Sequence, residues 1–177
     1  MNNALVQPFE KLERNQKAIF DLLGAVSPAV LSRSPAPGKW SILEILSHLI
    51  ISEKLTVRYM EKKFSGIETL KNSNVLHALR YFIFIAIINT NLKFKAPKVV
   101  VAQIPPPGSF EELKKEWLEV RKALKNILEN LKEEDNARLI FKHPIAGRFN
   151  IKQTLGFLDT HNQHHVPQMK SILKKMG

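Results

Sequence analysis

One stretch in the second half of the chain constrains the fold most, because it specifies both a helix and the face that the helix buries. It reads SFEELKKEWLEVRKALKNILENL, residues 109–131. Ser109, followed three residues later by Glu112, is the pattern of a capping box that opens a helix. Apolar residues then recur at helical spacing and predict one buried stripe: Leu113, Trp117, Val120, Leu124, Ile127, Leu128 and Leu131.

Other segments show the same helical periodicity. Residues 41–64 open with a second capping box, formed by Ser41 and Glu44. Residues 8–26 and 151–176 carry apolar stripes, and Asn150 is the predicted N-cap of the second of these helices. Residues 70–90 are more apolar still, and we interpret the run 81–88 as a buried helix segment, too short to span a bilayer. This third helix could pack internally or form a dimer face. Between the helices, 137–141 could be a short extended piece and 143–147 a turn. With no convincing strand alternation, we predict an all-α bundle in a single domain, residues 1–177.

Composition excludes several classes of function. The chain has no cysteine, so disulfides, thiolate-bound zinc and thiol nucleophiles are all excluded. The first residues alternate apolar and charged side chains, unlike a signal peptide, and we expect a cytoplasmic protein. The formal net charge is +11, but the lysines are spread along the chain and no nucleic-acid motif is present. We therefore predict a basic surface, with neither nucleic acid nor a membrane as partner.

Half of the six histidines fall within the short run THNQHH, as His161, His164 and His165. On a helix, residues four apart lie on one face, so His161 and His165 can reach a single metal ion. His161 and His164, three apart, are the competing pair. The predicted inward stripe continues from Leu158 to His161 and His165, which favours that pair and leaves His164 at the rim.

A third ligand has to come from another helix, and His48 is the best candidate because it follows the inward-facing Ile45 by three residues. The alternative is a surface pair, with His48 a core histidine whose hydrogen bonds are satisfied by water or a side chain. His143 precedes Pro144 and is predicted to be an exposed or hydrogen-bonded turn residue. His77 is expected to pack within its own helix and to take no part in chemistry.

Two segments resemble a known family. KWSILEILSHLIISE resembles a W-S-x-x-E-x-x-x-H-L segment, and HPIAGRFNIKQTLGFLDTHNQHHVPQMKSIL resembles H-P-x-x-G followed by a helix carrying H-x-x-H-H-x-x-Q. Both patterns are those of the DinB-like (DinB/YfiT-like) superfamily of metal-dependent enzymes, which this chain resembles, and their order is the same here. The similarity extends over most of the chain.

This resemblance implies a four-helix bundle in an up-down-down-up arrangement with a long crossover, for which residues 97–108 are the candidate. It also implies a divalent metal ion, nickel or zinc, held by His48, His161 and His165. Family members are often homodimers, and some are S-transferases that use low-molecular-weight thiols such as bacillithiol or mycothiol.

We therefore predict a metal-dependent enzyme for a small-molecule substrate, either a thiol-dependent S-transferase or a hydrolase, because three neutral ligands leave coordination positions open. Arg148 is the candidate to hold an anionic thiol. Glu53 is either a base near the metal or, as we expect, a solvated charge. Pro167 lies inside the last helix and predicts a bend. The alternative functions are a non-catalytic metal- or ligand-binding bundle of stress-response type and, less favoured, a DNA-binding protein.

Overall fold

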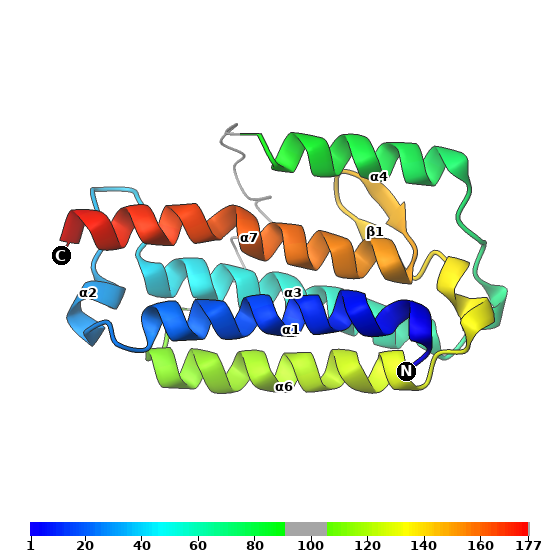
Figure 1. The fold of residues 1–177 in the computed structure, drawn as a ribbon, viewed down its shortest axis with the longest axis horizontal. Coiled ribbons are helices and arrows are strands. Elements are labelled where there is room, and N and C mark those ends of the chain that lie inside the picture. The colour runs from blue at the N-terminus through cyan, green and yellow to red at the C-terminus, as the bar shows by residue number, and fades with distance from the viewer. Residues whose placement is uncertain (91–105, 177) are drawn as a thin grey trace.

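Four long helices form the body of the protein. The computed structural model describes residues 1–90 and 106–176. Helices α1 (Asn3–Leu23), α3 (Ile42–Phe64), α6 (Phe110–Glu129) and α7 (Ile151–Met176) lie side by side (Figure 1). The colours in Figure 1 show α1 and α7 running in one direction and α3 and α6 in the other. The predicted all-α class and up-down-down-up arrangement are therefore confirmed.

The starts of the long helices follow from the capping residues read in the sequence. In α3 and α6, Ser41 and Ser109 each accept a hydrogen bond from the backbone N–H three residues on, and the glutamate there accepts one in return. Asn150 caps α7, because Gln153 N–H donates to its Oδ1 over 2.9 Å. The first helix begins at Asn3 rather than at Pro8. The last helix continues through Pro167 without interruption.

The core lies between these helices. Every residue of the apolar stripe predicted for residues 109–131 is buried, from Leu113 to Leu131. These side chains meet buried residues of α1, α3 and α7 in two hydrophobic clusters, one toward each end of the bundle. At roughly 25 cal/mol per Å² of apolar surface removed from water, such burial is the main force that holds the helices together.

Short elements connect the long ones. They are α2 (Pro28–Ser32), η1 (Ile67–Thr69), α4 (Val75–Ile88), η2 (Glu133–Ala137), β1 (Phe141–His143) and β2 (Gly147–Phe149). The two strands form an antiparallel hairpin in which Phe141 faces Phe149 and His143 faces Gly147. The sequence predicts only an extended piece and a turn there. Gly147 adopts φ +84°, a conformation that favours glycine.

The prediction of a buried third helix was wrong. No residue of α4 is buried, and Phe82 and Ile83 are 66% and 52% exposed. This helix lies within the crossover between α3 and α6, alongside the first half of α7 (Figure 1). Of the predicted crossover, residues 97–105 fall outside the described residues. Within residues 1–90 and 106–176, no helix combines the length and the apolar character needed to cross a membrane.

The expectation that Glu53 is a solvated charge was also wrong. This carboxylate on α3 is 1% exposed and accepts hydrogen bonds from the Trp117 indole at 2.9 Å and from Arg121 Nε at 2.8 Å, both on α6. Arg121 also pairs with Glu13 of α1 at 3.0 Å. Because both oxygens of the Glu53 carboxylate already accept hydrogen bonds from Trp117 and Arg121, Glu53 is not available as a base. The buried network instead fixes the rotation of α3 about its axis.

Candidate metal centre

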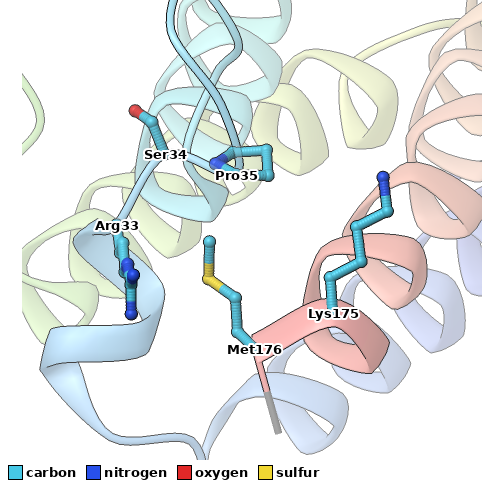
Figure 2. A pocket seen from close by; sticks show the side chains of 5 residues that line it. All are labelled: Arg33, Ser34, Pro35, Lys175 and Met176. Atoms are coloured by element: carbon cyan, nitrogen blue, oxygen red, sulfur yellow. The ribbon is translucent and has the colours of Figure 1, made fainter.

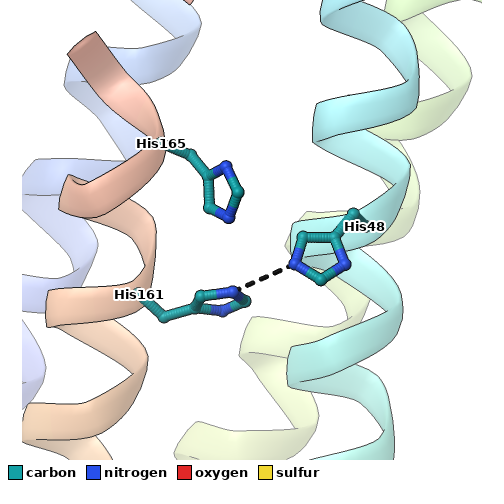
Figure 3. Close-up of side chains that lie close together, drawn as sticks. All are labelled: His48, His161 and His165. Atoms are coloured by element: carbon teal, nitrogen blue, oxygen red, sulfur yellow. Dashed lines mark hydrogen bonds between the residues drawn. The ribbon is translucent and has the colours of Figure 1, made fainter. Parts of the chain in front are cut away.

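Three imidazole rings converge in the space between α3 and α7 (Figure 3). His48 comes from α3, while His161 and His165 project from successive turns of α7. His48 is 5% exposed, and His161 and His165 are partly buried. The structure thus brings together the three histidines selected from the sequence.

The rings are almost equally spaced. Their centroids lie 5.0 Å apart for His48 and His161, and 5.1 Å apart for each pair that includes His165. The Nε2 atoms of His48 and His161 are 3.0 Å apart, and one nitrogen from each ring can be chosen so that all three lie within 4.8 Å of one another. Among the described residues, this is the only such group of His, Asp or Glu side chains.

These distances fit a single divalent ion. Zinc–imidazole bonds of about 2.0–2.1 Å place neighbouring nitrogens of a tetrahedral site about 3.3–3.4 Å apart. The 3.0 Å between the His48 and His161 Nε2 atoms is close to that value, and the pairs that include His165 lie within 4.8 Å. Imidazole suits zinc, nickel, copper and iron alike, so the set of three does not select one metal by itself.

Neighbouring side chains orient two of the rings. His165 Nδ1 lies 2.9 Å from Gln168 Oε1, so this nitrogen donates its proton there and Nε2 keeps a free lone pair. The His161 ring stacks on Phe157, with centroids 5.6 Å apart and planes 11° from parallel. Gln168 and Phe157 were not predicted as supports, although the spacing of Gln168, three after His165, could have indicated it.

His48 is held by packing rather than by a second hydrogen bond. Its ring lies 5.1 Å from that of Trp40. Its Nδ1 is buried and has no hydrogen-bond partner among the described residues.

The surroundings keep all three imidazoles neutral. Burial, with a smaller contribution from His165, lowers the pKa of His48 to about 3. Burial also lowers the pKa of His165 to about 4, and that of His161 well below its usual value, where the neighbouring imidazoles add to the effect. A neutral imidazole has a lone pair to donate, so the cluster is ready to bind a cation at neutral pH.

The other histidines stand outside this cluster. The His164 ring is 5.3 Å from His165 but is not one of the three converging groups. His77 does not pack within its helix as predicted, but caps the start of α4 with Asn74. His143 is buried rather than exposed, and its Nδ1 accepts hydrogen bonds from the backbone N–H groups of Ile145 and Ala146.

The cation suggested for an anionic thiol lies on the wrong face of the hairpin. Arg148 is exposed and pairs across the strands with Lys142, whereas His143 and Phe149, one residue away on each strand, are buried. Side chains alternate along a strand, so Arg148 points away from the side that packs on α7. The expectation that it holds a thiol cofactor therefore gains no support.

A hollow at the far end of α7 is not a competing metal site (Figure 2). Its lining contains two cations and no carboxylate or imidazole: Arg33, Ser34, Pro35, Lys175 and Met176. Lys175 follows His165 by ten residues, about 15 Å along a helix axis. Within residues 1–90 and 106–176, the three histidines are the only group of His, Asp or Glu side chains that could hold a metal ion.

Comparison with known proteins finds a family whose sequence profile covers most of the helical bundle and the three histidines. The sequence profile of the DinB superfamily matches residues 11–169, which include all three histidines. The chain belongs to the DinB superfamily. YuaE of Bacillus subtilis strain 168, an uncharacterized protein, is similar in sequence. The two chains are 29% identical over 157 residues, which cover 87% of this chain and 90% of YuaE.

Two solved structures share the fold of this DinB superfamily chain. YfiT of Bacillus subtilis, described as a probable metal-dependent hydrolase with an unusual four-helix bundle topology, superposes with a TM-score of 0.61 at 14% identity, covering 100% of this chain and 90% of YfiT. A conserved protein of Enterococcus faecalis gives a TM-score of 0.57 at 15% identity, covering 99% and 98%. At these identities the likeness concerns the fold alone.

Proposed function

We propose that His48, His161 and His165 bind one divalent metal ion, nickel or zinc, and that the protein is a metal-dependent hydrolase acting on a small molecule. The observation that carries this proposal is the convergence of three neutral imidazoles within 4.8 Å, from two helices of the bundle. Three neutral protein ligands are typical of catalytic sites, which keep a coordination position open, rather than of closed structural sites.

A bound divalent ion would supply Lewis acidity, which makes a coordinated water or thiol more acidic. The chain supplies the orientation. Gln168 holds the proton of His165 on Nδ1, and Phe157 holds the plane of His161. Glu53 is sequestered by Arg121 and is therefore not available as a general base.

A thiol-dependent S-transferase is the second candidate, because the same open position could take a thiolate. The hydrolase is preferred because Arg148, the cation named for an anionic thiol, points away from the hairpin's buried side. The small-molecule substrate and the homodimer implied by the family are part of this proposal. The rival remains a bundle that binds metal without catalysis.

The metal itself can be tested first. The protein is purified without a polyhistidine tag, and bound metal is measured by mass spectrometry in the wild type and in His48→Ala and His165→Ala. We expect about one ion per chain in the wild type and loss of that ion in both variants. His164→Ala is the matched control, because it removes an adjacent imidazole outside the cluster and should retain the metal. Retention in His48→Ala or loss in His164→Ala would refute the ligand set.

Catalysis is then screened on the metal-loaded protein, with ester, amide and phosphoester substrates in one arm and electrophiles with low-molecular-weight thiols in the other. Metal-dependent hydrolysis that disappears in His165→Ala supports the hydrolase. Turnover that requires a thiol supports the S-transferase instead. Bound metal with no turnover in either arm would favour the non-catalytic rival.

A further inference from the structure

The hairpin of β1 and β2 carries a fourth imidazole close to the candidate metal centre, and the function proposed above gives it no role. His143 is the last residue of β1, and its side chain is 9% exposed. Its ring contacts four phenylalanine rings, those of Phe84, Phe141, Phe149 and Phe157. A polar ring in such apolar surroundings normally has a hydrogen-bond partner for each of its nitrogens. Here only one nitrogen has partners.

The turn of the hairpin determines which nitrogen of His143 carries the proton. The backbone N–H groups of Ile145 and Ala146 donate to Nδ1 over 3.2 Å and 3.1 Å, so Nδ1 is an acceptor and is not protonated. Burial lowers the pKa of His143 to about 4, so the ring is neutral at neutral pH. A neutral imidazole that accepts at Nδ1 has its proton on Nε2. Among residues 1–90 and 106–176, this Nε2–H has no acceptor.

Phe157 of α7 connects His143 to the metal ligands. Its ring centroid is 4.8 Å from that of His143 and 5.6 Å from that of His161, so the two imidazoles are no farther apart than the sum of these distances. Burial is the largest cause that lowers the pKa of His161, and the charge that His143 can carry is a smaller one, so the two rings interact through space. The described structure therefore places a neutral donor within the length of a small organic molecule from the ligands.

The strip between α4 and α7 that joins these two imidazoles is incompletely covered. Phe84 of α4 lies 4.4 Å from the His143 ring and 6.0 Å from Phe157, and it is only half-buried. His161 is half-buried as well. A ligand at the three histidines can therefore extend toward His143 along an aromatic surface.

We propose that His143 is a substrate-binding residue, whose Nε2–H donates a hydrogen bond to an uncharged carbonyl oxygen of the small molecule that reacts at the three histidines. The apolar body of the substrate would then lie along Phe84 and Phe157. This inference rests on the proposed function, because it assigns the other end of the substrate to His48, His161 and His165.

The surroundings of His143 select an uncharged acceptor. Burial alone accounts for its low pKa, so no charged side chain of the described residues acts on it appreciably. The two cations of the hairpin, Lys142 and Arg148, are exposed and lie on the opposite face of the strands. An anionic group placed among the phenylalanine rings would lose its hydration and gain only one neutral hydrogen bond, whereas a carbonyl loses much less.

Two substitutions separate the acceptor of this ring from its donor. The amide of Asn ends near the position of Nδ1, and the amide of Gln ends near the position of Nε2. His143→Asn therefore keeps an acceptor for Ile145 and Ala146 and loses the free donor, whereas His143→Gln keeps a donor and loses that acceptor. A role confined to the turn depends on the acceptor, and a role in substrate binding depends on the donor.

Two matched probes read out the donor through binding, without any need for turnover. They are para-acetylbenzohydroxamic acid and para-ethylbenzohydroxamic acid, which share a metal-chelating hydroxamate and an aromatic body and differ in one carbonyl group. Isothermal titration calorimetry gives their affinities for the zinc-loaded protein. We expect the wild type to prefer the acetyl compound by about 3- to 10-fold, the contribution of one neutral hydrogen bond. The preference should disappear in His143→Asn and persist in His143→Gln.

The control is His164→Asn, which removes another imidazole outside the three ligands and should keep the preference. Circular dichroism checks that each variant is folded. Loss of affinity for both probes alike in His143→Asn, or an unchanged preference, would overturn the role of His143 and leave the metal site standing. Binding of neither probe to any of these proteins would instead refute the metal site together with this inference.

The position of the proton can be read on the metal-free protein. Long-range hydrogen–nitrogen correlation NMR at neutral pH distinguishes a protonated ring nitrogen from an unprotonated one, and His143→Asn identifies the signals of His143 by their loss. We expect a protonated Nε2 and an unprotonated Nδ1. A proton on Nδ1 would overturn the proposal, whatever the metal site binds.

Discussion

Gly156 lets α4 lie close to α7, and replacing it should have opposite effects in two backgrounds. A Cβ at this position would collide with the Tyr81 hydroxyl, while the next ring atom, Cζ, is 3.5 Å away, an ordinary contact. Overpacking of this kind costs about 1–3 kcal/mol. Alanine in a helix interior gains about 1 kcal/mol over glycine. We therefore expect Gly156→Ala to lower the free energy of unfolding by about 0–2 kcal/mol.

Tyr81→Phe removes the hydroxyl and should reverse that sign. The hydroxyl makes no hydrogen bond to the described residues. Burial, aided by the charge of Asp159, raises its pKa to about 12, so it stays protonated at neutral pH. Its loss alone should cost less than about 1 kcal/mol. In the Tyr81→Phe background, Gly156→Ala should then be stabilising by up to about 1 kcal/mol, which is a coupling of roughly 1–3 kcal/mol between the two sites.

Urea unfolding of the four proteins, followed by circular dichroism at one protein concentration, measures this cycle. The concentration must be fixed because dimerisation would contribute to stability. If Gly156→Ala stabilises both backgrounds equally, Tyr81 does not lie over Gly156 and the seat of α4 on α7 is not as described. A changed m-value without a changed midpoint would point to the denatured state instead.

Three further outcomes are expected. Glu53→Ala should lower the free energy of unfolding by about 3–5 kcal/mol, because it leaves the buried Arg121 without its main partner. The control is Glu119→Ala, which removes an exposed carboxylate of α6 and should change the free energy of unfolding by less than about 0.5 kcal/mol. Equal effects of the two substitutions would contradict the buried network. Burial lowers the pKa of His143 to about 4, below its unfolded value of 6.5, so the unfolded state binds more protons and stability is lost as pH falls from about 6.5 to about 4. His143→Asn keeps an acceptor for the two backbone N–H groups and should reduce the slope of that loss of stability by up to about 1.4 kcal/mol per pH unit. Urea midpoints of chelator-treated protein measure the slope at each pH. An unchanged slope would show that the pKa of His143 does not differ between the folded and unfolded states. Finally, metal at 100 times its Kd should raise the free energy of unfolding by about 2.7 kcal/mol. A chelator should therefore lower the melting temperature of the wild type and not that of His165→Ala. A similar decrease in both proteins would contradict metal binding at this site.

Features specified by local sequence were predicted correctly. The capping boxes at Ser41 and Ser109 require residues only three positions apart, and the stripe from Leu113 to Leu131 repeats over five turns, so both can be read without knowing the fold. The grouping of His48 with the α7 pair also followed from helical faces, together with the family resemblance. Whether these histidines bind metal, whether the chain forms one domain and whether it is cytoplasmic remain predictions.

Features that depend on distant partners were missed. The burial of Glu53 is decided by Arg121, 68 positions away, and no local pattern announces that pairing. The apolar composition of α4 predicted burial, which was wrong, because hydrophobicity alone cannot tell whether another part of the chain covers a helix. The strands of the hairpin have three residues each, too few for alternation to be recognised.

The separation of His48 and His161 along the chain, 113 positions, has a consequence for biosynthesis. Two ligands lie on the last helix, so a ribosome-bound chain that has released α1, α3 and α6 still offers only His48. The proposed three-ligand site can therefore assemble only after α7 has left the ribosome and docked on α3. Metal bound at the proposed site would then report that α7 has docked on α3, as a late event rather than a nucleus for folding.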